Sequence, residues 1–403
     1  MVVRGLPYVH DMKKSRKLEQ HVAVFGESGS GKTVLLSSFY GAAQERDNIR
    51  SAGFHVLAEN PSQGTHLSQN YLGMKKSATR PEPNRFSAKS YSFLIKVASQ
   101  REGKSSGEEP FDALRLVWHD YPGEWFEHDV SGPEEAQRRA ETFRTLLQSD
   151  VAFLMVDGQR LVDNAGEEER YLKSLFTNYC NGLLLLRDDL LEDGHRLVTF
   201  PRIWILALSK ADLLPDMDVD EFRDVMLEKA GDDIEKLRDV LGGLVDSLDA
   251  LAVGEDFVTF SSAKFEVNKI DVDKRVGLNL ILPLASVFAF ERHLRWAQAG
   301  HLGRRLGLEL LKNAELVALG LGAIGGAIAK FAGSSNKAIA ALGLLLATAS
   351  PRLADAAKQL ETKIAEADAQ GEAKRNDLSA VLAGFRSALE KGEEERTFLR
   401  SLL

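Results

Sequence analysis

The sequence has one cysteine and no excess of basic residues. Cys180 is the single cysteine among 403 residues, so neither an internal disulfide nor a cysteine-rich zinc site can form. The 51 Lys and Arg residues are outnumbered by 59 Asp and Glu residues, which gives a formal charge of -8. A chain with this charge has no global positive field to attract nucleic acid, so we expect no nucleic-acid partner. The cysteine usage fits a reducing, cytoplasmic location.

Long apolar runs are also scarce. No apolar region follows the basic residues near the N-terminus, and we expect no secretory signal. Residues 316–350 are the exception, because Lys330 and Lys337 are their only charged side chains. Each uncharged stretch of this predicted apolar hairpin is shorter than the roughly 20 residues that cross a bilayer. A hairpin buried in the protein, a membrane-associated hairpin and an oligomer interface all remain open.

The remaining composition, 44% hydrophobic and 27% charged, is that of a globular protein long enough for two domains. In the first two thirds, short β-branched runs alternate with amphipathic stretches, which predicts an α/β fold with a mostly parallel sheet flanked by helices. The predicted strands are His21–Phe25, Ser92–Val97, Leu114–His119, Val151–Val156, Ile203–Leu208 and Phe257–Phe260. The predicted helices are Gly31–Ala43, Glu134–Gln148, Glu167–Leu191, Asp220–Leu251 and Leu278–Ala297, with a start or kink near Pro283.

Two stretches interrupt this alternation. Asn60–Arg85, rich in Ser, Asn and Pro, and Gln100–Pro110 are predicted to be loops of an insertion at about 44–110. After residue 298 the strand signals stop, and apolar residues at three- and four-residue spacing predict helices to the end of the chain. One of these helices carries Leu378, Leu382, Phe385 and Leu389 on its apolar face.

A glycine-rich segment, Gly-Glu-Ser-Gly-Ser-Gly-Lys-Thr at residues 26–33, follows the first predicted strand and opens a helix. This is the pattern and the context of a P-loop, in which backbone N–H groups at a helix N-terminus surround phosphate oxygens. Lys32 would contact the β- and γ-phosphates, and the Thr33 hydroxyl would ligate Mg²⁺. The predicted nucleotide-binding residues here are Gly26, Glu27, Ser28, Gly29, Ser30, Gly31, Lys32, Thr33 and Val34.

A second motif, Asp-Tyr-Pro-Gly-Glu-Trp, begins at Asp120 directly after the predicted strand 114–119. A carboxylate at this strand end can hold Mg²⁺ through water, and the Gly123 N–H can meet a γ-phosphate. Because Asp-x-Pro-Gly is also ordinary turn chemistry, the preceding P-loop is what gives the motif its meaning.

Two further motifs follow later predicted strands. In Ser-Lys-Ala-Asp, the Asp212 carboxylate can accept hydrogen bonds from N1 and N2 of guanine while the Lys210 stem packs along the base. The motif Ser261-Ser262-Ala263-Lys264 ends the next strand, where a backbone N–H can meet guanine O6. Each motif is weak alone, but their order and strand-end positions make coincidence improbable.

Together these four motifs resemble those of the translation-factor-related (TRAFAC) class of P-loop GTPases, over about residues 20–298. The hexapeptide at Asp120 more narrowly resembles the bacterial YcjX-like and double-GTPase relatives. The resemblance implies a GTP-binding, GTP-hydrolysing switch that uses Mg²⁺ and passes between GTP and GDP states. With the loss of strand signals after residue 298, this predicts an N-terminal extension at 1–19, a GTPase domain at 20–298 and an all-helical domain at 299–403.

Three positions depart from the class pattern. Ser209 stands where Asn or Thr is usual, which leaves a base-indifferent or ATP-using enzyme as an alternative. Glu124 stands where small GTPases use a Gln to orient water. It is assigned with Lys32 and Gly123 to catalysis, and its charge predicts slow turnover. A surface ion pair for Glu124 and a nucleotide-binding scaffold with little turnover are the competing interpretations.

The third departure is the 88-residue interval between Lys32 and Asp120, which leaves the Mg²⁺-sensing switch threonine ambiguous. Thr79 is favoured and joins Thr33 and Asp120 in the predicted metal site. Thr65, or neither threonine, is the alternative.

Other residues near these motifs have simpler interpretations. Asp157 is expected to hold a turn, His119 to be a packed histidine, and the arginines at 138, 139 and 144 to lie on a solvated helix face. The helical domain is expected to contact a protein partner or a second copy of the chain, and residues 316–350 are the candidate for contact with the inner membrane.

Overall fold

The computed structural model describes most of the first 298 residues and the last helix of the chain. The described residues are 19–82, 88–97, 112–126, 132–147, 149–191, 203–245, 251–266, 268–298 and 372–401, together with Gly194 and Leu197. The predicted apolar hairpin at 316–350, nearly all of the N-terminal extension and the predicted loop at 100–110 lie outside them. The predicted boundary at residue 298 therefore stays a prediction.

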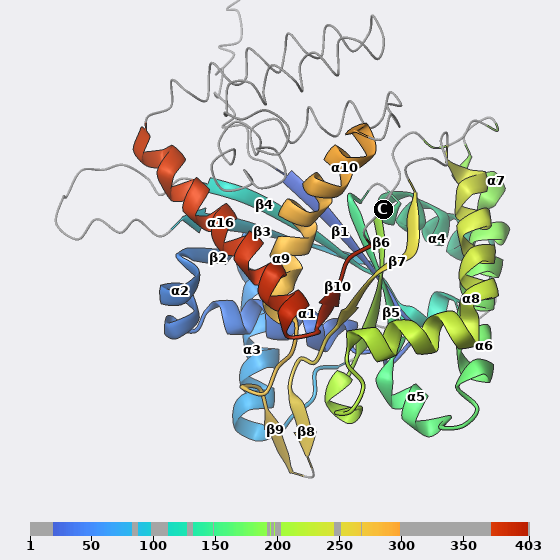
Figure 1. The fold of residues 1–403 in the computed structure, drawn as a ribbon, viewed down its shortest axis with the longest axis horizontal. Helices are drawn as coiled ribbons and strands as arrows, with labels where there is room; N and C mark the ends of the chain where they lie inside the picture. Colours follow the sequence, from blue (N-terminus) through green and yellow to red (C-terminus); the bar gives the residue numbers. More distant parts are fainter. Residues whose placement is uncertain are drawn as a thin grey trace, which may run out of the picture.

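An eight-stranded sheet forms the centre of the molecule, in the order β10-β7-β6-β5-β1-β4-β3-β2 (Figure 1). The five strands from β7 to β4 run parallel, whereas β2, β3 and β10 pair antiparallel at the two edges. The bounds are β1 Glu19–Phe25, β2 Phe54–Ala58, β3 Lys89–Val97, β4 Asp112–Asp120, β5 Val151–Asp157, β6 Ile203–Ser209, β7 Ala252–Thr259 and β10 Phe398–Leu399. All six predicted strands are present, and the predicted fold class is confirmed.

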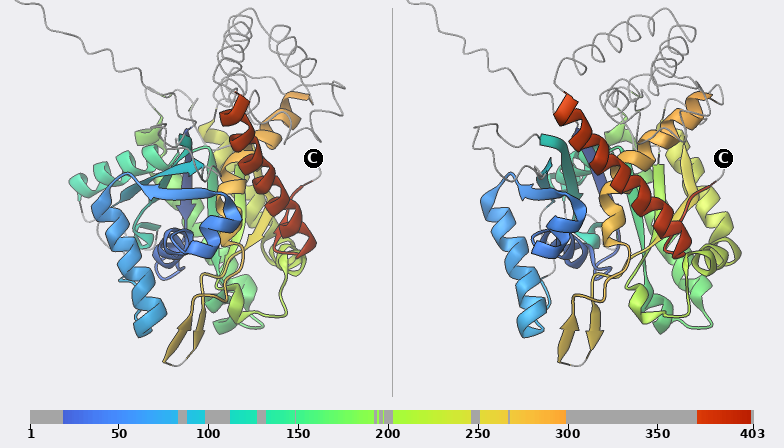
Figure 2. Two further views of the ribbon diagram at one scale, coloured as in Figure 1. Left: turned by 90° about the vertical axis from the view of Figure 1, so that its left-hand side faces the viewer. Right: turned by 60° about the vertical axis from the view of Figure 1, so that its left-hand side comes forward.

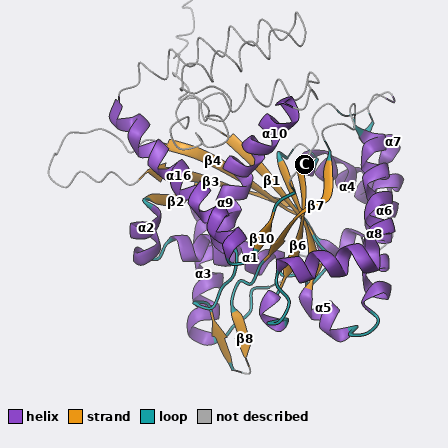
Figure 3. Cartoon of the chain, in the orientation of Figure 1, coloured by secondary structure: helices purple, strands orange, loops and turns teal. Residues whose placement is uncertain are grey.

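Helices cover both faces of this sheet. One face packs on α1, α3, α9, α10 and α16, and the other on α4, α6, α7 and α8 (Figures 1 and 3). The bounds are α1 Lys32–Ala43, α2 Arg46–Ala52, α3 Pro61–Ser77, α4 Pro133–Leu146, α5 Gly158–Asp163, α6 Glu168–Leu185, α7 Arg187–Leu190, α8 Val219–Leu244, α9 Ile281–Pro283, α10 Ala289–Gln298 and α16 Glu372–Glu394. Strands buried on both faces explain the continuous apolar runs of β5 and β6.

The prediction of a loop over Asn60–Arg85 is wrong, because most of this stretch is helix α3. The Asn60 side chain caps the helix by accepting hydrogen bonds from the backbone N–H of Ser62 and Gln63 at 3.0 and 3.3 Å. Pro61 occupies the first turn, where its missing N–H costs nothing. Leu67, Tyr71 and Met74 bury the apolar face. Of the Ser and Asn residues that suggested a loop, Ser62 and Ser77 are exposed, whereas the Asn70 amide donates to the Ser37 hydroxyl of α1 at 3.2 Å.

The segment around Pro283 is irregular, as its proline suggests. A short 3-10 turn at Leu278–Leu280 leads into α9, and a π-helical turn at Leu284–Phe288 separates α9 from α10. Apart from the exposed Asn279, the side chains from Leu278 to Phe288 are buried.

The C-terminal part of the chain returns to the sheet (Figure 2). The predicted apolar face of α16, which includes Leu382, Phe385 and Leu389, is buried in the same core as α1 and β3. After α16 the chain forms the short strand β10, where a helix was expected, and Phe398 pairs with Val258 of β7. None of the helices in the described part of the chain is long and apolar enough to span a membrane.

An ion pair and hydrogen bonds connect α10, β7 and the last described residues. Arg292 of α10 is fully buried, and its guanidinium lies 3.2 Å from the carboxylate of Asp256, which is also fully buried on β7. Asp256 accepts a hydrogen bond from the Ser401 N–H at 2.9 Å, and Arg295 donates to the Ser401 carbonyl at 3.0 Å. Burial raises the pKa of Asp256. These contacts join α10, β7 and the last described residues into one unit.

Candidate functional site

The predicted P-loop lies between β1 and α1, at the carboxyl end of the central strand. Gly29 and Gly31 have φ values of 80° and 93°, the left-handed region that favours glycine. The Lys32 ammonium donates to the backbone carbonyls of Gly26 at 2.6 Å and Glu27 at 3.0 Å. The loop therefore curls around its own lysine at the N-terminus of α1.

Tyr121 holds the second motif against the P-loop, a role that the sequence did not indicate. Its hydroxyl accepts from the Gly26 N–H at 2.8 Å and donates to the Gly26 carbonyl at 3.3 Å. The Lys32 ammonium lies 5.3 Å from the centre of the Tyr121 ring. Full burial raises the pKa of Tyr121 well above its ordinary value, so the hydroxyl stays protonated and can make both hydrogen bonds.

Gly123 touches the P-loop directly. A β-carbon on Gly123 would lie 2.4 Å from both the Glu27 carbonyl carbon and the Ser28 nitrogen. The two predicted phosphate-binding motifs are thus in backbone contact. Asp120 ends β4 beside β1 and is 2% exposed, and Glu124 follows Gly123 as a half-buried residue of a 3-10 turn at Gly123–Phe126.

The arginines after the second motif differ from one another. Arg139 was expected on a solvated face, but it is buried, pairs with Glu135 at 2.7 Å and donates to the Trp125 carbonyl at 2.9 Å. Its guanidinium also lies 5.9 Å from the centre of the Trp125 ring. Arg139 therefore anchors the end of the second motif. Arg138 is exposed as predicted, whereas Arg144 donates to the Asp189 carbonyl.

The third and fourth motifs meet beside the P-loop. The Ser261 hydroxyl donates to the Asp212 carboxylate at 2.7 Å and so fixes its orientation. The Lys210 ammonium pairs with Asp157 at 2.8 Å, while the other carboxylate oxygen of Asp157 caps α5 at the Gln159 N–H. The expected turn role of Asp157 is confirmed. Ser261 belongs to the predicted fourth motif, but its contact with Asp212 was not predicted.

A cavity of about 320 Å³ joins these parts. Its lining includes eight of the predicted nucleotide-binding residues: Gly29, Ser30, Gly31, Val34, Lys210, Asp212, Ser262 and Ala263. The other predicted nucleotide-binding residues, from Gly26 to Ser28 with Lys32, Thr33 and Lys264, do not line it. Lys264 is exposed and pairs with Glu266 at 3.4 Å. The cavity is therefore bounded by the P-loop glycines at one end and Asp212 at the other.

Some lining residues were outside the predicted set. Ser209, expected to affect base choice, lines the cavity and donates its hydroxyl to the Val156 carbonyl at 3.2 Å. Arg80, Gln159 and Phe265 also line it. No motif marks these three residues in the sequence, because they reach the cavity only through the fold.

Of the predicted metal ligands, Thr33 and Asp120 lie at the candidate site, whereas Thr79 is not joined to the P-loop by a hydrogen bond in the described residues. Thr33 lies in the first turn of α1, and Asp120 lies at the end of β4. Thr79 follows α3, and its exposed hydroxyl donates to the Ser77 carbonyl at 3.3 Å. Thr65, the alternative, is exposed within α3. Neither threonine has a hydrogen bond to the P-loop within the described residues.

The hydroxyl and carboxylate of Thr33 and Asp120 suit Mg²⁺, which takes oxygen ligands and keeps several waters or phosphate oxygens. No group of three or more His, Cys, Asp or Glu side chains in the described residues could hold a metal ion.

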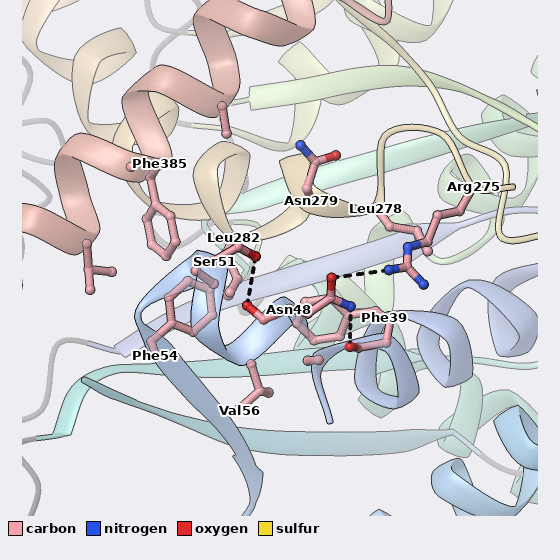
Figure 4. Close-up of a pocket in the computed structure, with 16 residues that line it drawn as sticks. Phe39, Asn48, Ser51, Phe54, Val56, Arg275, Leu278, Asn279, Leu282 and Phe385 are labelled. Carbon is pink, nitrogen blue, oxygen red and sulfur yellow. Dashed lines mark hydrogen bonds between the residues drawn. The ribbon is translucent and has the colours of Figure 1, made fainter. Parts of the chain in front are cut away.

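A second cavity, of about 310 Å³, lies between α2, β2 and α16 (Figure 4). Its walls are largely apolar and include the rings of Phe39, Phe54 and Phe385. At one side the Arg275 guanidinium donates to the Asn48 side chain at 3.3 Å. None of the predicted site residues lines this cavity, so it is separate from the candidate site.

Comparison with known families gives one finding. The model of a family described as Double-GTPase 2 matches residues 20–240, more than half of the chain. The match spans the P-loop, the second motif and the third motif. A comparison with curated proteins finds no match.

Proposed function

Because the chain belongs to the Double-GTPase 2 family, we propose that it binds GTP together with Mg²⁺ and hydrolyses it at the P-loop. The observation that carries this proposal is the cavity between Gly29 and Asp212. It has a phosphate-binding loop at one end and an oriented carboxylate at the other, as a nucleoside triphosphate requires.

Guanine is the base that this carboxylate favours. Each oxygen of a carboxylate has two lone pairs, so the Asp212 oxygen that accepts from Ser261 can accept a second hydrogen bond. Guanine offers two adjacent N–H donors to such a group, whereas adenine offers an acceptor at N1. An adenine nucleotide would leave the carboxylate without those partners, and a desolvated carboxylate without partners costs binding free energy.

Residues of the P-loop and of the second motif would have different roles at the phosphates. Lys32 can reach them with its ammonium, and the Gly123 N–H lies in a segment in contact with Glu27 and Ser28. Glu124 would position the attacking water. Mg²⁺, held by Thr33 and Asp120, would neutralise charge on the β- and γ-phosphates. A carboxylate near the γ-phosphate repels it, so we expect slow intrinsic turnover.

The contact between the two motifs also supports a role as a molecular switch. The hydroxyl of Tyr121 joins the second motif to Gly26, so a change at the γ-phosphate can pass to the segment that Arg139 anchors. In this proposal the nucleotide state is read by a protein partner, a second copy of the chain or a membrane through the residues after 298.

Competition binding tests the base preference. A fluorescent GDP analogue is displaced by GTP, GDP, ATP or ADP from the wild type and from Asp212→Asn. We expect GTP and GDP to compete at least 100-fold better than the adenine nucleotides, and Asp212→Asn to lose most of that preference. Equal competition by ATP and GTP in both proteins would show a base-indifferent enzyme.

A further inference from the structure

Arg80 and Phe265 are far apart in the sequence but lie together at the nucleotide cavity. Arg80 follows α3, and Phe265 lies in β8 (Lys264–Glu266), just after the fourth motif. The carbon at the centre of the Arg80 guanidinium is 5.4 Å from the centre of the Phe265 ring. Both side chains line the cavity that also contains Gly29 and Asp212.

The charge of Arg80 is available to a ligand. The Lys210 ammonium is paired with Asp157, and the Lys32 ammonium is bound by two carbonyls of the P-loop. Within the part of the chain that the structure describes, no carboxylate lies within ion-pairing distance of Arg80, and its side chain is exposed. A nucleotide brings several negative charges into this cavity, and a guanidinium is well suited to phosphate oxygens.

The cavity lining indicates which part of the nucleotide Arg80 faces. The lining contains P-loop residues 29–31, Val34 and Leu35 together with the base-binding motifs, but not Thr33, Asp120 or Gly123. These last residues belong to the γ-phosphate end of the proposed site. Arg80 therefore faces the stretch between the base and the first phosphate.

We propose that Arg80 binds the α-phosphate of the guanine nucleotide and that Phe265 holds the guanidinium in position. This inference rests on the proposed function. Stacking on the ring orients the plane of the guanidinium and leaves its N–H edge free to donate to phosphate oxygens. Arg80 is then a binding residue and takes no part in the hydrolytic step.

The test measures dissociation constants for guanosine, GMP, GDP and GTP, with guanosine followed by ligand-observed NMR. The variants are Arg80→Gln, Arg80→Lys, Phe265→Leu and, as a matched control, Lys76→Gln, which removes an exposed cation from α3. Arg80→Gln should lower the affinity for GMP, GDP and GTP by a similar factor, roughly 10- to 100-fold. Its affinity for guanosine should stay within about 2-fold of the wild-type value. Phe265→Leu should lower the affinity for the same nucleotides by roughly 3-fold. The affinity of Arg80→Lys should lie between those of Phe265→Leu and Arg80→Gln. The control Lys76→Gln should bind all four ligands and turn over GTP within about 2-fold of the wild type.

Three results would overturn the proposal. If Arg80→Gln bound guanosine and GDP more weakly by the same factor, Arg80 would contact the base or ribose. If only the affinity for GTP fell, Arg80 would contact the γ-phosphate. If Arg80→Gln bound all four ligands with the same dissociation constants as Lys76→Gln, Arg80 would have no role in nucleotide binding. If the wild type bound no guanine nucleotide, the proposed function itself would fail, which is a different outcome from these three.

Discussion

Gly123 packs so tightly on Ser28 that a methyl group at Gly123 would lie 2.4 Å from the Ser28 nitrogen. Both partners in this contact are backbone, which has no rotamer to change. The second motif can therefore keep its place against the P-loop only while residue 123 has no side chain. This is a packing reason for glycine, in addition to the N–H that the γ-phosphate would need.

The contact predicts that Gly123→Ala separates the two motifs. Because the added carbon cannot fit, we expect GTP affinity to fall by at least 10-fold and turnover to fall further. Gly132→Ala is the matched control, since a β-carbon there meets nothing within 4 Å. Nucleotide binding by fluorescence and phosphate release are the measurements. Equal values for the two variants would contradict the packing argument.

Tyr121→Phe tests the link between the second motif and Gly26. The substitution keeps the ring but leaves the buried Gly26 N–H without the acceptor seen at 2.8 Å. An unsatisfied buried donor costs about 1–3 kcal/mol, so the free energy of unfolding should fall by that amount and GTP affinity should fall with it. Tyr91→Phe, at a buried position on β3, is the control for loss of a hydroxyl. A stable variant with normal GTP binding would rule out this role of Tyr121.

Ser261→Ala tests the orientation of Asp212. Without the hydroxyl donor at 2.7 Å, the carboxylate can rotate away from the base. We expect GTP to bind roughly 5-fold more weakly while ATP affinity is unchanged, so the preference for guanine narrows. Competition binding with the two nucleotides measures both. Parallel weakening of GTP and ATP would mean that Ser261 supports the cavity and not the base contact.

The buried ion pair between Arg292 and Asp256 should matter for stability, not for nucleotide binding. Arg292→Leu leaves the fully buried Asp256 without this partner, which typically costs about 3–5 kcal/mol of unfolding free energy. Replacing Asp256 by Asn in the same chain should recover part of the loss. Chemical denaturation gives the values. A loss below about 1 kcal/mol would show that the pair is dispensable.

His119 predicts an acid-dependent loss of stability. Burial and the neighbouring His21 lower the pKa of His119 to about 4 in the folded protein, against roughly 6.5 in an unfolded chain. Between these two pH values the unfolded chain binds more protons at His119 than the folded protein does, so the free energy of unfolding rises with pH. This contribution of His119 is lost as the pH falls from 6.5 to 4. The loss from this residue approaches about 3 kcal/mol.

The measurement is denaturant unfolding of the nucleotide-free protein, with a chelator present, at pH 7 and pH 4.5. His119→Gln should lose less stability than the wild type over this range, whereas exposed His66→Gln should behave as the wild type does. Identical pH dependence in all three proteins would contradict the low pKa of His119.

The sequence predicted the central fold because that part depends on local patterns. Apolar β-branched runs marked β1, β5 and β6, and the glycine-rich segment marked the turn into α1. Helix α3 was missed because its polar face dominates its composition and its four buried residues are a minority. Strand β10 was missed because two residues carry no periodic signal, and its pairing partner β7 lies over 130 residues away.

The candidate site divides in the same way. Gly29, Lys32, Asp120 and Asp212 belong to motifs whose chemistry can be recognised along the chain. Ser261, Tyr121 and Arg80 act through contacts with residues distant in sequence, and such contacts exist only in the folded protein. The burial of Arg139 was missed because its contact with the Trp125 carbonyl depends on how the end of the second motif folds onto α4.

Phosphate release from GTP is the most direct test of the central claim that this chain is a Mg²⁺-dependent GTPase. We compare the wild type with Lys32→Ala, each with Mg²⁺ and with excess chelator. The account predicts slow release by the wild type with Mg²⁺, and no release above background in the other three conditions. Release that persists in Lys32→Ala or without Mg²⁺, or no release from the wild type at saturating GTP, would contradict it.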